Sequence, residues 1–242
     1  MFYKTNNPQS FRKPFSTGNR KIAQNPPPSS NSDFYAWEFE DTNWEEYNST
    51  SGANFSGSGN INSFGKIGNA VQNPGLKIQS SFVVNNLFLN WEEDWAICCW
   101  TLAGSSAQLR LNCNENNESN RLWGFWRTLN KTKIRFYIGN ASIDHTISSS
   151  PDFIWVIHDS SLDSPLGDPP YNLIFGTNDD AGTSYTTSSV LSVPSNPTNP
   201  TLHLTDFNTE VVDQLIIFKE RKTPADMAVI WNNNDGINLS SL

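Results

Sequence analysis

The stretch Val211–Gly236, VVDQLIIFKERKTPADMAVIWNNNDG, predicts a buried strand that leads directly into a helix. Its run from Leu215 to Phe218 is apolar at every position. A surface strand alternates apolar and polar residues, whereas a strand that is covered on both faces is apolar throughout. We therefore expect a central strand here, covered on one side by a neighbouring sheet and on the other by the helix or a loop.

The helix in this stretch carries signals at both of its ends. Thr223 suits the N-cap position, because Pro224 is then the first helical residue and Asp226 the third. The Asn run and Gly236 favour a C-terminal end just beyond it. We expect one short C-terminal helix that closes one edge of the sheet. The side chains on its apolar face are Met227, Ile230 and Trp231.

The composition of the chain favours an all-β fold. The 242 residues include 31 Asn, and aromatic residues make up 12%, nine of them Trp. A disordered chain lacks aromatic residues, so this chain folds. Short aromatic and β-branched runs separated by turn residues are typical of strands, while 48–60 is a loop-like Gly/Ser/Asn stretch. We predict strands at 34–41, 76–84, 86–91, 95–103, 107–113, 121–127, 132–139, 153–158, 171–176, 186–193, 201–205 and 211–219.

Several classes of protein are disfavoured by simple patterns. No apolar run reaches about 18 residues, so we expect no membrane span, and the N-terminal stretch lacks the apolar segment of a secretory signal. The three cysteines are too few for a disulfide scaffold, and their spacing does not fit a zinc site. Cys98 and Cys113 flank the Ser105–Ser106 turn symmetrically and would face each other across a two-residue hairpin. A disulfide there would be strained, so we expect two buried free thiols.

Charge is unevenly distributed along the chain. Residues 1–32 carry five of the 16 basic residues and no acid, whereas 33–242 carry the other 11 and all 24 acidic residues. We predict an extended basic arm and linker at 1–32 and a folded domain at 33–242. The arm has no core-forming pattern, so we expect other structural proteins of an assembly, or further copies of this chain, to bind it. Its partner-binding residues are Phe2, Tyr3, Lys4, Phe11, Arg12, Lys13, Phe15, Arg20 and Lys21.

Three segments carry a recognisable pattern: FGKIGNAV at 64–71, DWAICCWTLAG at 94–104 and the stretch 211–236. Together they resemble the laminin-G-like domains of the concanavalin A-like lectin/glucanase superfamily. The resemblance covers about 34–240 and implies a two-sheet antiparallel jelly-roll sandwich. Members commonly have an acid after the Asp of the closing strand, whereas Gln214 follows Asp213 here. That Asp is structural in most members, so the implied fold is unaffected.

The glucanases of that superfamily hold two carboxylates on one face of a strand, about 5 Å apart. Glu38 and Glu40 would share a face but have no third acid at the required spacing, and the neighbours in 92–94 point to opposite faces. Glu210 and Asp213 are three positions apart and are also split. We expect no catalytic residues and no enzymatic activity.

Polar loops are the candidate binding sites, because glycan recognition needs aromatic platforms beside amides and carboxylates. The predicted glycan-binding residues are Asn114, Asn116, Asn117, Asp179, Asp180 and Tyr185. No cofactor is expected, but calcium stays open, since laminin-G-like relatives often bind it at a rim of the sandwich. Solvated turns are the alternative explanation of these acidic loops. The candidate calcium ligands are Asp159, Asp163, Asp168, Asp179 and Asp180.

These observations predict a non-enzymatic structural or adhesion protein that docks through its arm and displays a lectin-like sandwich to surface glycans. Domains of the resembled type are common on bacteriophage virions, so the resemblance implies a capsid decoration or a head or tail fibre subunit at the virion surface. The alternative is an extracellular carbohydrate-binding module or a fragment of a secreted glycoside hydrolase. Nucleic-acid binding is disfavoured, because the five charges of the arm are spread over about 18 residues.

Overall fold

The computed structural model describes most of the predicted domain and none of the basic arm. The predicted partner-binding residues between Phe2 and Lys21 lie outside the described residues, as do Asn116, Asn117 and Asp168. The described residues are 34–48, 50, 52–63, 65–78, 83, 87, 89, 91–102, 108–115, 121–128, 132–147, 152–163, 171–186, 198–207 and 211–242.

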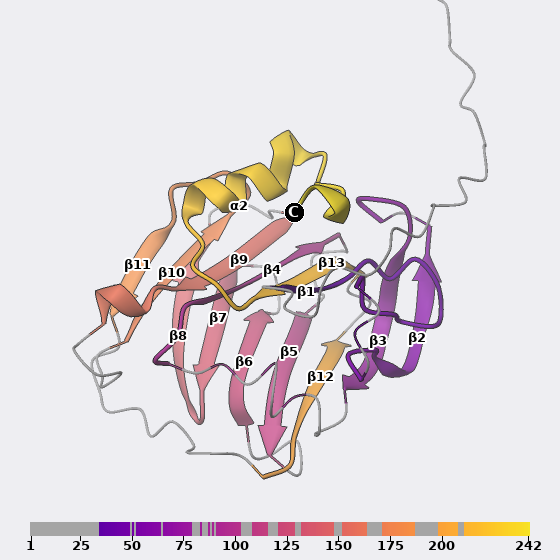
Figure 1. The fold of residues 1–242 in the computed structure, drawn as a ribbon, viewed down its shortest axis with the longest axis horizontal. Helices are drawn as coiled ribbons and strands as arrows, with labels where there is room; N and C mark the ends of the chain where they lie inside the picture. Colours follow the sequence, from indigo (N-terminus) through magenta and orange to yellow (C-terminus); the bar gives the residue numbers. More distant parts are fainter. Residues whose placement is uncertain are drawn as a thin grey trace, which may run out of the picture.

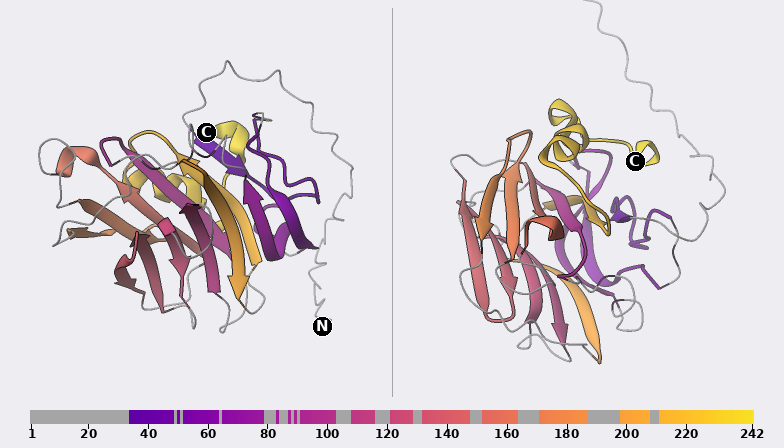
Figure 2. Two further views of the ribbon diagram at one scale, coloured as in Figure 1. Left: turned by 90° about the horizontal axis from the view of Figure 1, so that it is seen from below. Right: turned by 60° about the vertical axis from the view of Figure 1, so that its left-hand side comes forward.

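The described strands form one 13-stranded antiparallel sheet that folds over into two layers (Figure 1, Figure 2). Two residue pairs between β13 and β3 connect the layers. The first layer consists of β11 (Thr183–Thr186), β10 (Asn172–Thr177), β9 (Phe153–His158), β4 (Trp95–Thr101), β13 (Val211–Phe218) and β1 (Phe34–Trp37). The second consists of β2 (Ser56–Asn62), β3 (Ala70–Ile78), β12 (Pro200–Phe207), β5 (Gln108–Glu115), β6 (Arg121–Arg127), β7 (Lys133–Ile138) and β8 (Ala141–Thr146).

The main core lies between the two layers. The ring of Trp95 on β4 stacks on that of Phe136 on β7, with centroids 5.3 Å apart, although the two strands are distant in the sheet order. A buried polar contact also joins the layers, since the guanidinium of Arg127 donates to the backbone oxygen of Thr101 at 3.1 Å. Apolar side chains from both layers therefore share one core, as a sandwich requires.

The outer face of the first layer is covered by α2 (Pro224–Trp231). The predicted cap is confirmed: the Thr223 hydroxyl accepts from the Asp226 amide, and the Asp226 carboxylate accepts from the Thr223 amide at 2.7 Å. Met227 and Ile230 are buried against the layer. The helix continues into short 3-10 turns, η4 (Asn232–Asn234) and η5 (Leu239–Ser241). None of the described helices is both long and apolar enough to cross a membrane.

The prediction of a central strand at the closing segment is confirmed, because every residue of β13 is buried. Asp213 on this strand connects two of the segments that carry the family pattern. Its Oδ2 accepts from the backbone amide of Ile67 at 2.9 Å, which fixes the Gly-rich turn before β3. Burial raises the pKa of Asp213 to about 7, although backbone amides lower it in part. Gln214 follows with φ +43° at a shift of register, so β13 bulges here.

The loop predicted at 48–60 is wrong in its second half, because β2 begins at Ser56. β2 pairs only with β3, and its side chains are largely exposed, so its sequence has no apolar alternation to reveal it. At Gly57, an added Cβ would lie 2.1 Å from the backbone oxygen of Gly75. Glycine is thus needed where the two backbones approach each other.

Several other strand predictions are corrected. The strand predicted at 76–84 is β3, Ala70–Ile78, and the strand predicted at 186–193 begins earlier, as β11, Thr183–Thr186. The strand predicted at 34–41 ends at Trp37, so Glu38 and Glu40 are not on a strand. In the strand predicted at 86–91, the described positions Leu87 and Leu89 are buried in the core but lie outside any strand. The alternating apolar residues of this segment are buried, but they do not form a strand. The hairpin partner of β7, β8, was not predicted.

The predicted hairpin that would set Cys98 opposite Cys113 is wrong. β4 pairs with β9 and β13, whereas β5 pairs with β6 and β12. Cys98 packs in the cluster beneath α2, and Cys113 packs between the layers. Both are free, buried thiols, as predicted, and burial raises the pKa of each.

Candidate functional site

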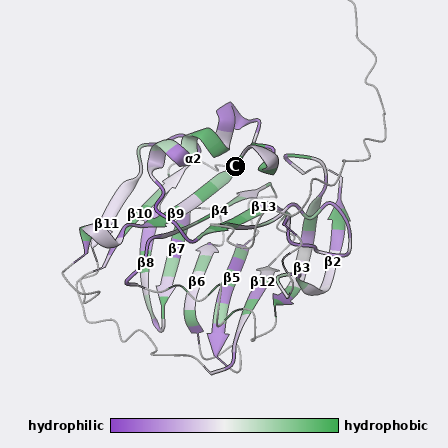
Figure 3. Ribbon diagram, viewed as in Figure 1, coloured by the Kyte–Doolittle hydropathy of each residue, from purple (hydrophilic) through white to green (hydrophobic). Residues whose placement is uncertain are grey.

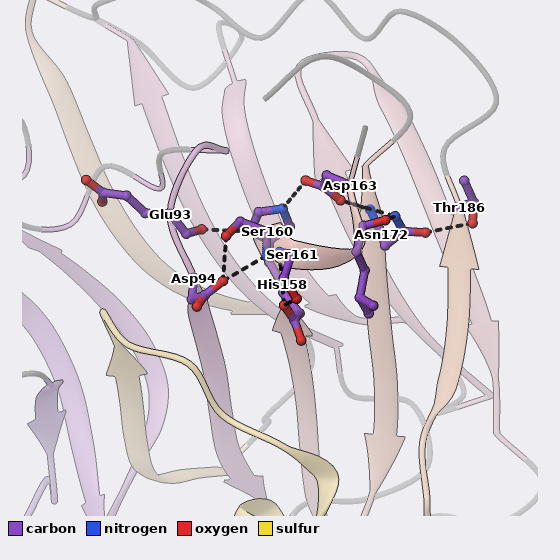
Figure 4. Close-up of polar contacts among 10 residues, drawn as sticks. Glu93, Asp94, His158, Ser160, Ser161, Asp163, Asn172 and Thr186 are labelled. Atoms are coloured by element: carbon purple, nitrogen blue, oxygen red, sulfur yellow. Dashed lines mark hydrogen bonds and ion pairs between the residues drawn. The ribbon is translucent and has the colours of Figure 1, made fainter. Parts of the chain in front are cut away.

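The loop after β9 carries two of the candidate calcium ligands and is organised by His158 (Figure 4). The buried ring places Nδ1 2.8 Å from the backbone oxygen of Glu93 and Nε2 2.8 Å from Oδ2 of Asp163. Each ring nitrogen thus lies beside an acceptor, one a backbone carbonyl and the other a carboxylate. The ring also stacks on Trp95, with centroids 5.1 Å apart. These contacts make His158 a structural centre of the loop.

The carboxylates of this loop are occupied by protein donors. Asp159 accepts from the Arg221 guanidinium at 2.6 Å and from the Ser161 amide at 3.1 Å. Asp163 accepts, besides His158, from the Asn172 amide at 2.7 Å. No three Asp, Glu, His or Cys side chains among the described residues gather closely enough to hold a metal ion. The described carboxylates of the loop thus hold it closed through hydrogen bonds to the protein's own donors.

The second predicted loop forms the turn between β10 and β11. Asp180 closes it by accepting from the backbone amides of Thr177 and Gly182, each at 3.0 Å. Tyr185 on β11 reaches the second layer, where its hydroxyl lies 3.0 Å from Nδ1 of His145. Asp179 is exposed beside Asp180. This rim thus joins the edges of the two layers.

Asn114 lies away from that rim. Through β7 and β6, His145 is in register with Leu109, five positions from Asn114 along β5. The structure therefore brings Asp179, Asp180 and Tyr185 together but leaves Asn114 elsewhere. The described members of the predicted glycan site do not form one site.

Asn114 belongs to the outer face of the second layer. Along β5 to β8, apolar residues point to the core and polar or aromatic residues point outward, an alternation that Figure 3 shows in colour. None of the buried clusters of the described residues includes α2 together with this face. We use the name Arg–aromatic face for Arg110, Asn112, Asn114, Arg121, Trp126, Arg135, Tyr137 and Asp144.

Two rows of paired residues cross this face from strand to strand. Each row places one aromatic ring, Trp126 or Tyr137, among hydrogen-bonding side chains. The first row is Arg110, Trp126, Arg135 and Asp144, and the second is Asn112, Gly124, Tyr137 and Ser142.

Aromatic rings hold the guanidinium groups of this face in place. The guanidinium carbons of Arg110 and Arg121 lie 4.6 and 4.7 Å from the Trp126 ring centroid. That of Arg121 also lies 3.9 Å from the centroid of Tyr137. The Trp126 indole is fixed in turn, because Nε1 donates to Oδ1 of Asn112 at 2.6 Å. Such cation–π contacts orient the arginines before any ligand arrives.

Local backbone features bring Arg121 onto this face. A shift of register between Cys113 and Asn114 inserts Leu122 and pairs Arg121 with Asn114, so Arg121 shares the outward side. Gly124 then leaves room for it. An added Cβ at Gly124 would lie 2.6 Å from Oδ1 of Asn112 and 3.1 Å from Cδ of Arg121.

The charge of this face is opposite to that of the chain, whose net charge is −8. Burial is the largest cause that lowers the pKa of Arg121, and the charges of Arg110 and Arg135 lower it further, while Tyr137 opposes them. Asp144 accepts from Arg135 and Lys133, and the bond from Arg135 is the main cause that lowers the pKa of Asp144. Among the described outward residues of β3 and β5–β8, the cations are Lys77, Arg110, Arg121, Lys133 and Arg135, and the acid is Asp144.

The sequence analysis missed all of this face except Asn114. The signal was present in the strands KIRFYI and QLRLNCN, where alternation sets Arg135 and Tyr137, or Arg110 and Asn112, opposite the apolar side. Alternation along one strand does not reveal the order of the strands in the sheet. That order places these side chains next to one another.

Solved binding domains of botulinum neurotoxins and of a mosquitocidal protein are similar in structure. The serotype G neurotoxin binding domain gives a TM-score of 0.54 at 11% identity, over 84% of this chain and 51% of that chain. The binding domain of Paraclostridial Mosquitocidal Protein 1 gives 0.54 at 12%, over 83% and 52%. The receptor binding domain of the C/D mosaic neurotoxin gives 0.53 at 11%, over 82% and 50%.

This chain thus spans about half the length of the solved chains that it resembles. At these identities the likeness shows the fold: an all-β antiparallel domain with a short C-terminal helix. No protein-family model matches this chain, and no curated protein sequence matches it.

Proposed function

We propose that this chain is a non-enzymatic, lectin-like domain of the concanavalin A-like, laminin-G-like type that binds an oligosaccharide on its Arg–aromatic face. The observation that carries the proposal is the make-up of that face. The half-buried ring of Tyr137 lies beside amides and arginines on one outward sheet surface, where Trp126, only 9% exposed, holds the guanidinium groups of Arg110 and Arg121. Sugars are bound by such combinations, because their C–H faces pack on rings while their hydroxyls bond to amides and charged groups.

The comparison with solved structures supports a recognition role. One similar structure is described as a receptor binding domain, with a TM-score of 0.53. We carry over only the general role, recognition of a partner molecule, and assign it to residues of this chain.

The placement of the acidic residues supports a role without catalysis. Glu38 and Glu40 follow the end of β1, and Glu40 accepts from the backbone amide of Asn69 at 3.1 Å. Glu93 faces Lys219 at 3.7 Å. A glycosidase needs two carboxylates that flank one open position. We expect no release of reducing sugar from β-glucans or galactans, and turnover abolished by Glu38→Gln or Glu93→Gln would contradict this.

A pair of tyrosine variants of the full chain tests the location of the glycan site. A glycan array is probed with Tyr137→Ala, on the Arg–aromatic face, and with Tyr185→Ala, on the rim predicted from sequence. Binding that is lost in Tyr137→Ala and kept in Tyr185→Ala supports the proposal. Binding lost only in Tyr185→Ala would place the site on the rim, and an array with no bound glycan would contradict a lectin role.

We further propose that the domain is a multicopy component of a virion, a capsid decoration or a fibre subunit at the virion surface, attached through 1–32. The support is electrostatic: residues 1–32 carry five basic residues and no acid, whereas 33–242 carry 11 basic and 24 acidic residues, so the two parts attract each other within one copy or between copies. Assembly of particles with chains lacking 1–32, and with Phe11→Ala/Phe15→Ala, tests it. Normal incorporation of both would contradict it. An extracellular carbohydrate-binding module is the alternative, and it would bind the glycan without particles.

A further inference from the structure

We infer that the ligand of the Arg–aromatic face is an acidic oligosaccharide, one whose sugars carry carboxylate groups. This inference rests on the proposed function and narrows it from glycans in general to one chemical class. It follows from three features of the face: its charge, the geometry of its guanidinium groups and the neutral groups beside them.

The positive charge of the face favours the binding of an anion. Three arginines share it with one carboxylate, Asp144, and Asp144 already accepts from both Arg135 and the neighbouring Lys133. The guanidinium groups of Arg110 and Arg121 lie 4.6 and 4.7 Å from the centroid of the same indole ring, Trp126, so two like charges are held near each other. An anionic group placed between them would relieve that repulsion, and a neutral sugar would not.

The guanidinium geometry fits a carboxylate. Arg135 shows the arrangement within the face itself: its Nε and Nη2 contact the two oxygens of Asp144 at 2.5 and 2.8 Å. Arg121 is held by two rings, and its Nε has no hydrogen-bond partner among the described residues. A planar carboxylate of a sugar acid would give Arg121 the two-point contact that Asp144 gives Arg135.

The neutral groups of the face fit a sugar rather than a phosphodiester chain or a lipid headgroup. Asn114 is paired with Arg121, and its side-chain oxygen accepts no bond from the described residues. An acceptor next to a cation requires a ligand that supplies both a hydroxyl donor and a negative charge. Sugar acids carry both groups on adjacent carbons. Thr201 and Ser142, also outward, add hydroxyls at the two sides.

The experiment measures binding of the full chain by titration calorimetry. The probes are oligogalacturonate and sialyllactose, and each has a matched neutral control, the methyl-esterified oligogalacturonate and lactose. The variants are Arg121→Gln and Arg121→Lys. The matched control is Arg221→Gln, which removes the same charge from a position three residues after β13, where Arg221 bonds to Asp159. Circular dichroism confirms that each variant is folded.

We expect at least one acidic probe to bind ten times or more tightly than its neutral control, and weaker binding at higher salt. Arg121→Gln should weaken it about tenfold or more, Arg121→Lys should not restore it, and Arg221→Gln should change it less than twofold. Equal binding of acidic and neutral probes would overturn the inference and leave the lectin role standing. Binding of neither kind of probe, with an empty glycan array, would refute both.

Two further results would also overturn the inference. Selective binding of a sulfated oligosaccharide or of a DNA oligonucleotide, with no binding of the carboxylated probes, would show that the face takes another anion. An equal loss of affinity for the acidic probe in Arg121→Gln and Arg221→Gln would show that the overall charge of the chain, and not this face, controls binding.

Discussion

Gly124 leaves the space in which two side chains of the Arg–aromatic face meet. Asn112 and Arg121 approach each other over its Cα, and Asn112 in turn fixes Trp126. The pairing Asn112–Gly124–Tyr137 puts this gap in the middle of the sheet, not at an edge. Glycine is therefore needed at this position for the shape of the Arg–aromatic face. It is not needed for backbone freedom, because φ at Gly124 is not in the left-handed region.

Gly124→Ala is expected to disrupt this arrangement. The new Cβ would lie 2.6 Å from Oδ1 of Asn112, so Asn112 or Arg121 must move. We expect a loss of about 1 kcal/mol of stability and weaker glycan binding, measured by urea unfolding and calorimetry. Gly75→Ala is the matched control, because its Cβ would meet only the flexible Ser58 hydroxyl, at 3.2 Å, at close range. Equal effects of the two variants would contradict the role given to Gly124.

The raised pKa of Asp213 predicts that the stability of the domain depends on pH. Burial raises its pKa to about 7 in the folded state, whereas an unfolded Asp has a pKa near ~3.9. Between these values the folded state holds a proton that the unfolded state has lost. The free energy of unfolding should therefore fall as pH rises from about 4 to about 7, by up to a few kcal/mol.

Asp213→Asn tests this assignment by urea unfolding between pH 4 and pH 8. Asparagine keeps an oxygen that can accept from the Ile67 amide but cannot ionise. We expect the variant to lose most of the slope of stability against pH. Asp179→Asn, which changes an exposed carboxyl, should keep the slope. A slope that survives in Asp213→Asn would assign it to other groups.

The helix α2 depends on both its sequence and its surroundings. Its capping box is local, made by Thr223 and Asp226, and was predicted from sequence. Its position is not local, since Met227 and Ile230 pack against the first layer, where Cys98 also lies. The helix therefore serves as the cover of that layer, and the second layer keeps its polar outer face.

Thr223→Ala should loosen this cover. The loss of an N-cap acceptor costs about 1 kcal/mol, and local opening of α2 should expose the Cys98 thiol to a labelling reagent more often. Urea unfolding and the rate of thiol labelling measure the two effects. Thr223→Ser keeps the hydroxyl acceptor and should behave almost as the unchanged protein. Unaltered labelling in Thr223→Ala would show that the cap does not hold α2 on the layer.

The described part of the predicted domain forms a sandwich of two layers. β1 begins at Phe34 and pairs with β13 through Trp37, and the described core residues all follow position 33. The two outer faces of the sandwich differ, since α2 packs on one and the Arg–aromatic face lies on the other. A domain built in this way can attach by one region and bind ligand by another.

Deletion of 1–32 should leave the domain folded. Because the described strands and core residues all come from the predicted domain, we expect the melting temperature to change by less than about 3 °C, which corresponds to less than about 1 kcal/mol at this size. Differential scanning calorimetry of the full and shortened chains measures the difference. A larger fall would mean that the arm packs on its own domain. Glycan binding should be equal in the two chains.

Much of this architecture could be predicted from local sequence. The cap and apolar face of α2, the buried run of β13 and the strands near 95–103 and 121–127 depend on neighbours within a few positions, so their patterns are visible in the chain. β2 escaped prediction because an exposed edge strand buries too little to leave a pattern. Leu87 and Leu89 led to a wrong strand prediction, because burial alone does not distinguish a strand from other conformations.

Prediction of the Arg–aromatic face would have required the long-range pairing of the strands. Arg110, Trp126 and Arg135 come from three strands, and only the register of β5, β6 and β7 sets them in one row. The bulge that turns Arg121 outward is likewise a property of pairing, since Arg121 and Trp123 would otherwise share a side. Alternation thus determines which side chains point outward, whereas strand order determines which of them meet, because contacts across a sheet join residues far apart in the chain.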